Sequence, residues 1–131
     1  MSELRADTIT ASDGTSPVTL TKQSAAKAFF YFDGTGTPAI LASENGSSIT
    51  DIGTGNYEPN TISSFSSVTD YCVNLMASDN NAFQATTYED GANESNRTAS
   101  KFRMSVVNLQ TQPGVRADSS QINVLIHGDL A

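Results

Sequence analysis

An alternation of apolar and polar side chains at every second position constrains the fold of this chain more than any other feature. Residues 101–106 and 121–127 both follow it. Successive side chains of a β-strand point to opposite faces, so this spacing predicts two strands with one buried face each. The side chains expected in the core are Phe102, Met104, Val106, Ile122, Val124 and Ile126. Those expected to face solvent are Lys101, Arg103, Ser105, Gln121, Asn123 and His127.

Short apolar runs separated by turn sequences predict the remaining strands. The runs are separated by Asp-Gly, Asn-Gly and Gly-Thr-Gly, and no stretch of ten or more residues keeps a helical period. Residues 91–100 are polar throughout and are expected to form an exposed loop. We predict an all-β domain over residues 28–131, built as an antiparallel β-sandwich or small barrel. Its further strands are expected at residues 28–32, 39–43, 48–52, 56–59, 71–77 and 82–88.

The first predicted strand is apolar on both of its faces. Ala28, Phe30 and Phe32 fall on one face, and Phe29 and Tyr31 fall on the other. One face packs in the core, so the second needs a neighbour to cover it. We therefore predict that Phe29 and Tyr31 lie at an oligomer interface, since a small core also gives limited stability to a single copy.

The N-terminal stretch, residues 1–27, differs from the rest of the chain. Its aliphatic residues Ile9, Val18 and Leu20 stand isolated among Ser, Thr, Asp and Gly. So few apolar side chains cannot bury a core, but they suit an extended strand that adds to the open sheet edge of another protein. We predict that residues 1–27 form an extended N-terminal docking segment.

Composition and charge exclude two classes of partner. Ser and Thr supply 32 of the 131 residues, which is typical of strands with polar outer faces. The net charge is −7 and the basic residues are not clustered, so no nucleic-acid grip is expected. No run approaches the roughly 18 apolar residues of a membrane span. The N-terminus lacks the basic-then-apolar layout of a signal peptide, which predicts synthesis and folding in a cytoplasm.

The residue types that carry chemistry are scarce. Cys72 is the only cysteine and sits in an apolar run, so a buried, inert thiol is expected. His127 is the only histidine and is expected on a solvated strand face, without the geometry that a general base requires. One Cys and one His far apart do not provide the ligand set of a zinc site. We predict neither catalytic residues nor a cofactor or metal site, and hence no enzymatic activity.

Several segments of the chain, taken in order, resemble modules of tailed-bacteriophage virion proteins. An aromatic-rich strand and Gly-Thr turn, a Ser-Ile-Thr-Asp strand with a Gly-Thr-Gly hairpin, a short Tyr-containing strand and a closing strand are similar to tail-fibre and appendage modules. The stretch before the first strand is similar to one that often precedes this module. The segments are DTITASDG (7–14), KAFFYFDGTGT (27–37), SSITDIGTGNY (47–57), YCV (71–73) and SSQINVLIHGD (119–129).

The resemblance implies a homotrimeric β-module located on a virion, made in the host cytoplasm. It would be a structural, fibre-like appendage (a tail fibre or its tip) that attaches to the host or to the particle. The implied partners are other phage virion proteins of the tail or capsid, and a host-surface glycan where the module forms a tip.

Two alternatives remain open at this stage. The first is a capsid decoration, or cement, protein on the phage head. The second is a monomeric carbohydrate-binding β-module, whose sugar-stacking rings would be Tyr31, Tyr57, Tyr71 and Tyr88, although the chain contains no Trp.

Overall fold

The computed structural model describes residues 26–78, 83–87, 97–110 and 113–131, and every structural statement below concerns these residues. In this part of the chain all regular elements are β-strands, as predicted. The strands are β1 (Ala28–Asp33), β2 (Ala39–Glu44), β3 (Gly46–Gly53), β4 (Asn56–Thr61), β5 (Tyr71–Ser78), β6 (Phe83–Thr87), β7 (Arg97–Thr98), β8 (Lys101–Phe102), β9 (Met104–Asn108), β10 (Val115–Arg116) and β11 (Gln121–Gly128).

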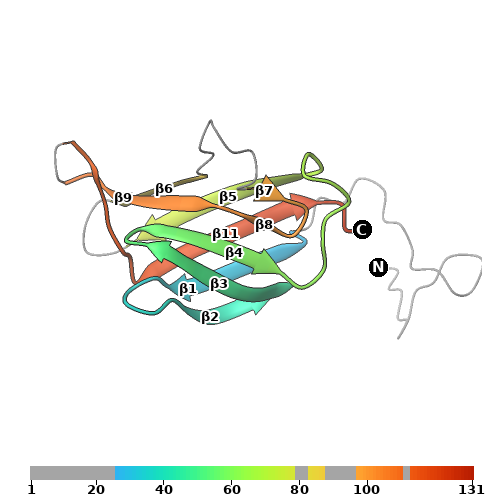
Figure 1. Ribbon diagram of the computed structural model, residues 1–131, viewed down its shortest axis with the longest axis horizontal. Helices are drawn as coiled ribbons and strands as arrows, with labels where there is room; N and C mark the ends of the chain where they lie inside the picture. The colour runs from blue at the N-terminus through green and yellow to red at the C-terminus, as the bar shows by residue number, and fades with distance from the viewer. Residues whose placement is uncertain (1–25, 79–82, 88–96, 111–112) are drawn as a thin grey trace, which may run out of the picture.

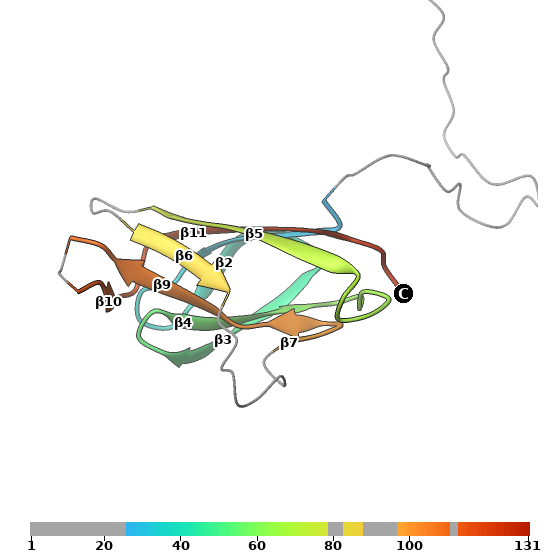
Figure 2. The ribbon, with the colours of Figure 1, turned by 90° about the horizontal axis from the view of Figure 1, so that it is seen from above.

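The strands form two antiparallel sheets that face each other (Figure 1 and Figure 2). The first, here the four-stranded sheet, has the order β2-β1-β11-β5. The second has the order β10-β9-β4-β8-β7, with β3 paired to β4 and β6 paired to β9. The predicted all-β class is confirmed, and the arrangement is compatible with the predicted β-sandwich or small barrel.

The core lies between the two sheets and uses the predicted side-chain parity. All six side chains expected to face inward from residues 102–106 and 122–126 are at most 2% exposed. On β1 the inward residues are Ala28, Phe30 and Phe32, and Phe32 packs edge-on against Tyr57 with ring centroids 5.4 Å apart. The prediction of the core-facing positions is therefore confirmed.

One end of the sandwich is closed by hydrogen bonds around Tyr57. Its hydroxyl lies 2.9 Å from the carbonyl oxygen of Gly34 and 2.8 Å from Oδ1 of Asp118. Asp118 Oδ1 also accepts a hydrogen bond from the backbone N–H of Gly55 at 2.7 Å. Burial, with Asp118 beside it, raises the pKa of Tyr57 above its ordinary value, so the hydroxyl stays protonated and remains a donor. The contact joins three loops that are far apart in sequence.

The opposite end of the core is filled by an aromatic pair that the alternation did not reveal. Phe65 stacks on Tyr71 with ring centroids 4.7 Å apart, and the Arg97 guanidinium lies 4.2 Å from the Tyr71 ring centroid. The Tyr71 hydroxyl donates a hydrogen bond towards the carbonyl oxygen of Thr98 at 2.8 Å. Phe65 lies between strands, in a segment without periodicity, and for that reason its burial was not predicted.

Three local predictions were wrong. Residues 101–106 do not form one strand, because the chain leaves the strand conformation at Arg103 between β8 and β9. Ser105, expected to face solvent, is only 3% exposed, since β9 runs between Asn56 on β4 and Thr86 on β6. The described part of the predicted exposed loop, residues 97–100, is half-buried and includes β7.

Candidate assembly surface

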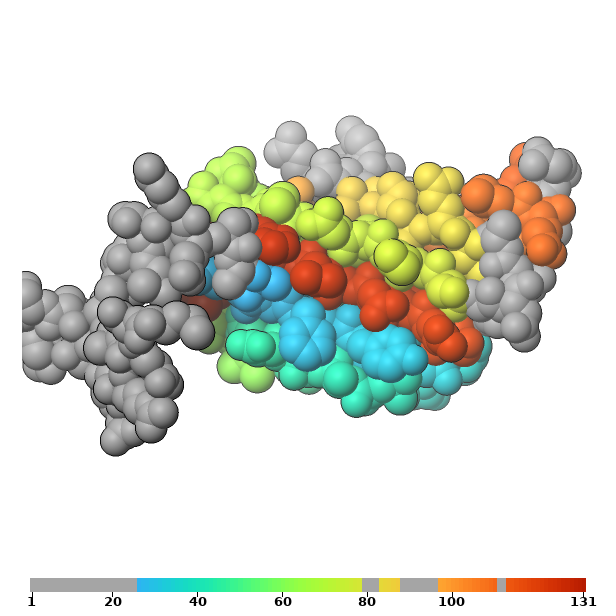
Figure 3. Space-filling model, turned by 180° about the vertical axis from the view of Figure 1, so that it is seen from behind, coloured from blue at the N-terminus to red at the C-terminus, as the bar shows by residue number. Residues whose placement is uncertain are grey.

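The four-stranded sheet presents an outer face that points away from the core and that is apolar at its centre. Figure 3 shows this face, with β2, β1, β11 and β5 side by side. We call it the Tyr31 face. It consists of Phe29, Tyr31, Ala42, Glu44, Cys72, Asn74, Met76, Asn123, Leu125 and His127.

The strand register arranges these side chains in rows across the sheet. In one row Ala42, Tyr31, Asn123 and Met76 are neighbours on successive strands. The adjacent row, two residues along, contains Glu44, Phe29, Leu125 and Asn74. Because every second residue of a strand shares a face, both rows point outward together. The face therefore has Phe29, Tyr31 and Leu125 on its two central strands and Met76 on the edge strand β5, with Asn123 as a polar residue among them.

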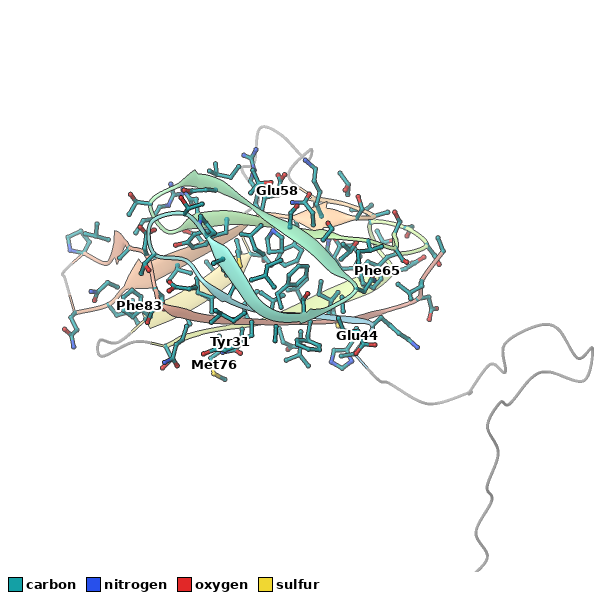
Figure 4. The ribbon with its side chains drawn as sticks, turned by 90° about the horizontal axis from the view of Figure 1, so that it is seen from below. Tyr31, Glu44, Glu58, Phe65, Met76 and Phe83 are labelled. Atoms are coloured by element: carbon teal, nitrogen blue, oxygen red, sulfur yellow. The ribbon has the colours of Figure 1, made fainter. Side chains whose placement is uncertain are left out.

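The apolar side chains of the Tyr31 face are highly exposed for apolar residues on a domain of this size. Met76 is 64% exposed and Leu125 is 43% exposed, while Phe29 and Tyr31 are partly buried. Figure 4 shows Tyr31 and Met76 pointing away from the core on the same side, with Glu58 on the opposite side of the molecule. The structure thus places the two predicted interface residues, Phe29 and Tyr31, beside two further apolar side chains from β5 and β11.

Sequence reasoning missed Met76 and Leu125 as parts of this surface. The signal lay in the pairing of strands, since Met76 and Leu125 join Tyr31 and Phe29 only through the order β1-β11-β5. Each strand carries one outward apolar residue in an otherwise polar set, which alone is ordinary. Their side-by-side placement makes them a contiguous patch, and such patches are typical of contact surfaces between proteins.

Cys72 lies at the margin of the Tyr31 face, and the prediction that it is buried was wrong. Its thiol is exposed, because Tyr71, Val73 and Leu75 take the inward positions of β5. Its cross-strand neighbour is His127, which is half-buried and whose Nδ1 is buried without a hydrogen-bond partner among the described residues. The predicted outward orientation of His127 fits the register.

We expect Cys72 to react readily with a maleimide in the folded protein at concentrations low enough that copies do not associate. Its rate should lie within about tenfold of the rate in denaturant, because an exposed thiol needs no unfolding step before it reacts. Mass spectrometry of samples quenched over time measures both rates. Native labelling slower by several orders of magnitude, matching the rate of global unfolding, would show that the thiol is buried.

The outer face of the second sheet is polar, and its buried carboxylate is paired with basic side chains of the same region. Glu58 is 6% exposed, and its two carboxylate oxygens contact Lys101 Nζ at 3.0 Å and Arg103 Nε at 3.4 Å. A buried carboxylate needs such partners, so the cluster is explained by the burial of Glu58. The hydroxyl of Ser105 and Oδ1 of Asn56 are buried nearby without hydrogen-bond partners in the described residues.

Two strands at the sheet margins, β2 and β3, are poorly suited to accept a strand, whereas β5, the other edge of the four-stranded sheet, pairs with β11 without a register shift. β2 is an edge of the four-stranded sheet, and its pairing with β1 shifts register between Tyr31 and Phe32. β3 lies at the margin of the second sheet and shifts register against β4 at both of its ends. Bulges of this kind twist an edge and disfavour edge-to-edge pairing. The face, more than these two edges, therefore remains available for contacts.

Two of the four tyrosine rings that the carbohydrate-binding alternative requires at the surface are buried in the structure. Tyr57 is 1% exposed and Tyr71 is 5% exposed, so neither can stack on a sugar. Tyr31 stays at the surface, and Tyr88 lies outside the described residues. The predicted docking residues Ile9, Val18 and Leu20 also lie outside the described residues.

Among the described residues, no three His, Cys, Asp or Glu side chains are grouped so that they could hold a metal ion. Within the same part of the chain, no helix is long and apolar enough to cross a membrane.

No family model, no curated protein and no solved structure matches this chain significantly. The function of this chain is therefore inferred from its sequence and from the geometry of the Tyr31 face.

Proposed function

We propose that this chain is a non-enzymatic structural component of a phage virion, of the fibre-like appendage type, that works by assembling with copies of itself and with other virion proteins. The observation that carries the proposal is the Tyr31 face. It exposes Met76 and Leu125, and part of Phe29 and Tyr31, on the side of the four-stranded sheet that faces away from the core.

The Tyr31 face favours assembly over catalysis. A finished core needs no further apolar surface for folding, so an exposed patch at the centre of a sheet is best explained by contact with another protein. Aromatic residues and Met are enriched at the centres of such contacts, and polar side chains are enriched at the rim. The phage assignment itself comes from the resemblance of the ordered sequence segments to virion modules.

Assembly with other virion proteins is assigned to residues 1–27. Their isolated aliphatics, Ile9, Val18 and Leu20, suit strand addition to a partner's sheet edge, in which backbone hydrogen bonds supply the attachment. Side chains at alternate positions would then set the register. The β-domain is left to face outward or to contact other copies.

Removal of the docking segment tests this function. A chain that starts at Lys27 should keep the β-domain folded, because the described core uses no residue before Ala28. It should fail to join particles that lack the native protein, whereas the full chain should restore occupancy. Quantitative mass spectrometry of purified particles measures both. Normal occupancy of the truncated chain would assign docking to the β-domain, and absence of the full chain from particles would refute the virion role.

The same particles separate the appendage from the capsid alternative. Immunogold labelling at the tail supports a fibre-like appendage, and labelling over the head supports a decoration protein. The homotrimer that the resemblance implies stays a prediction that no described residue tests.

A further inference from the structure

We infer that the Tyr31 face is covered by the same face of a second copy of this chain, with the strands of the two copies aligned. The inference rests on the proposed function and names the partner of its assembly surface. Three properties of the face carry it: its size, the sequence of side chains along its rows, and the bulged edges beside it.

The first property is the size of the face. It has four strands, six residues long for β1 and β2 and eight for β5 and β11. At about 4.8 Å between strands and 3.3 Å per residue, its projected area is roughly 400–500 Å². Side-chain relief adds to this area, and a standard interface buries about 800 Å² on each partner. A second sheet of equal size therefore covers the face, and no larger partner is required.

The second property is how each row of side chains fits against the same row in a second copy of the chain. A two-fold axis parallel to the strands, between β1 and β11, places β2 of one copy over β5 of the other. It also keeps each row opposite itself. Met76, the most exposed large apolar side chain of the face, then lies over Ala42, the smallest, and Tyr31 lies over Asn123. In the adjacent row Phe29 lies over Leu125, so that apolar groups meet.

The alternative two-fold arrangement fits less well. An axis perpendicular to the strands reverses the rows, which places Leu125 over Asn123 and Met76 over Asn74, although Tyr31 then lies over Phe29. Both exposed apolar side chains would then be buried against amides, and a buried amide without a hydrogen-bond partner is unfavourable. The aligned arrangement therefore buries the two exposed aliphatic side chains, Met76 and Leu125, on apolar groups, and leaves Asn123 as the amide opposite Tyr31.

The third property is the state of the sheet edges. Continuous pairing of two copies through β2 would extend the sheet and leave the Tyr31 face uncovered. The register shift between Tyr31 and Phe32 interrupts the ladder that such pairing needs. Contact through the face avoids this interruption.

Cross-linking between single-cysteine copies tests the arrangement. In the full-length chain with Cys72→Ser, the substitutions Ala42→Cys, Met76→Cys, Asn74→Cys and Ile62→Cys each introduce one exposed thiol. Ile62 is 71% exposed and lies outside the Tyr31 face, so it provides the matched control. Pairs of variants carrying tags of different mass are mixed at micromolar concentration and treated with a short bis-maleimide. Denaturing gels and mass spectrometry then give the yield of each mixed product.

We expect the Ala42→Cys and Met76→Cys pair to exceed the Ile62→Cys and Met76→Cys pair by about tenfold or more, because the contact raises the effective concentration. Predominance of the Asn74→Cys and Met76→Cys product would overturn the aligned arrangement in favour of reversed rows. Each copy carries one thiol, so a cross-linked product joins two copies at most, and the mass of the mixed variants before cross-linking gives the copy number. A mass of three chains would overturn the two-fold contact and support the homotrimer, and cross-linking yields equal to the control would remove self-contact through this face. Each of these failures leaves the virion role to be decided separately by particle occupancy.

Discussion

Phe30→Ala should reduce the free energy of unfolding by about 3–5 kcal/mol, whereas Phe29→Ala should reduce it by only about 1 kcal/mol. Phe30 is 1% exposed between the sheets, and its removal leaves a cavity that the surrounding side chains fill only partly. Phe29 is partly buried on the Tyr31 face, where solvent replaces the lost ring. The two residues are identical in chemistry and adjacent in sequence, so only the side of the sheet differs.

The comparison requires copies that do not associate, because self-association adds to apparent stability. Urea unfolding of both variants in a Met76→Asp background provides this condition, and the midpoints and slopes give the two free energies. Equal losses for Phe29→Ala and Phe30→Ala would mean that the assignment of inner and outer faces on β1 is wrong.

Gly55→Ala should have the second largest effect, a loss of about 3 kcal/mol or more, from two causes that add. Gly55 has φ +65°, a conformation that costs an L-residue about 1–2 kcal/mol. A Cβ at this position would also lie 2.6 Å from the carbonyl oxygen of Val106 and 2.7 Å from the backbone nitrogen of Ala117. Since both are backbone atoms, the loop contact through Asp118 would have to move.

Gly36→Ala separates the two causes. Gly36 has nearly the same φ, +63°, but a Cβ there meets no atom within 4 Å. It should therefore lose only the conformational part, about 1–2 kcal/mol. Thermal and urea unfolding of the two variants measure the difference. If Gly55→Ala were no more destabilising than Gly36→Ala, the close approach of the Gly53–Gly55 hairpin to Val106 and Ala117 would be excluded.

Strand parity was predictable wherever one face of a strand is apolar and the other polar. On β11 the side chains of Ile122, Val124 and Ile126 alternate with polar ones, and all three are fully buried. On β1 the parity was right although both faces are apolar, and the outward pair led to the predicted interface. Local side-chain chemistry is sufficient for such strands because burial follows directly from the two-residue period.

The prediction was wrong or silent where burial depends on neighbouring strands. The run around Cys72 is apolar at successive positions, so its sequence does not show which side chains point inward. Ser105 is covered because β9 lies between two other strands, and Phe65 is buried from a loop. Glu58 is a buried carboxylate whose partners, Lys101 and Arg103, lie more than 40 residues away in sequence. These features arise from long-range pairing.

The candidate surface was predictable only in part for the same reason. Phe29 and Tyr31 came from one strand, whereas Met76 and Leu125 joined them through pairing of β5, β11 and β1. The extent and shape of the Tyr31 face thus follow from the strand order, which the sequence pattern did not specify.

The mass of the full-length chain in solution tests the assembly role of the Tyr31 face most directly. Sedimentation equilibrium over the micromolar range measures it without labels or substitutions. A face-to-face pair predicts a mass of twice the 13.8 kDa of one chain, and dissociation towards a single chain when Met76→Asp places a charge on the face. A mass of 13.8 kDa for the unaltered chain at every concentration would contradict self-assembly through this face.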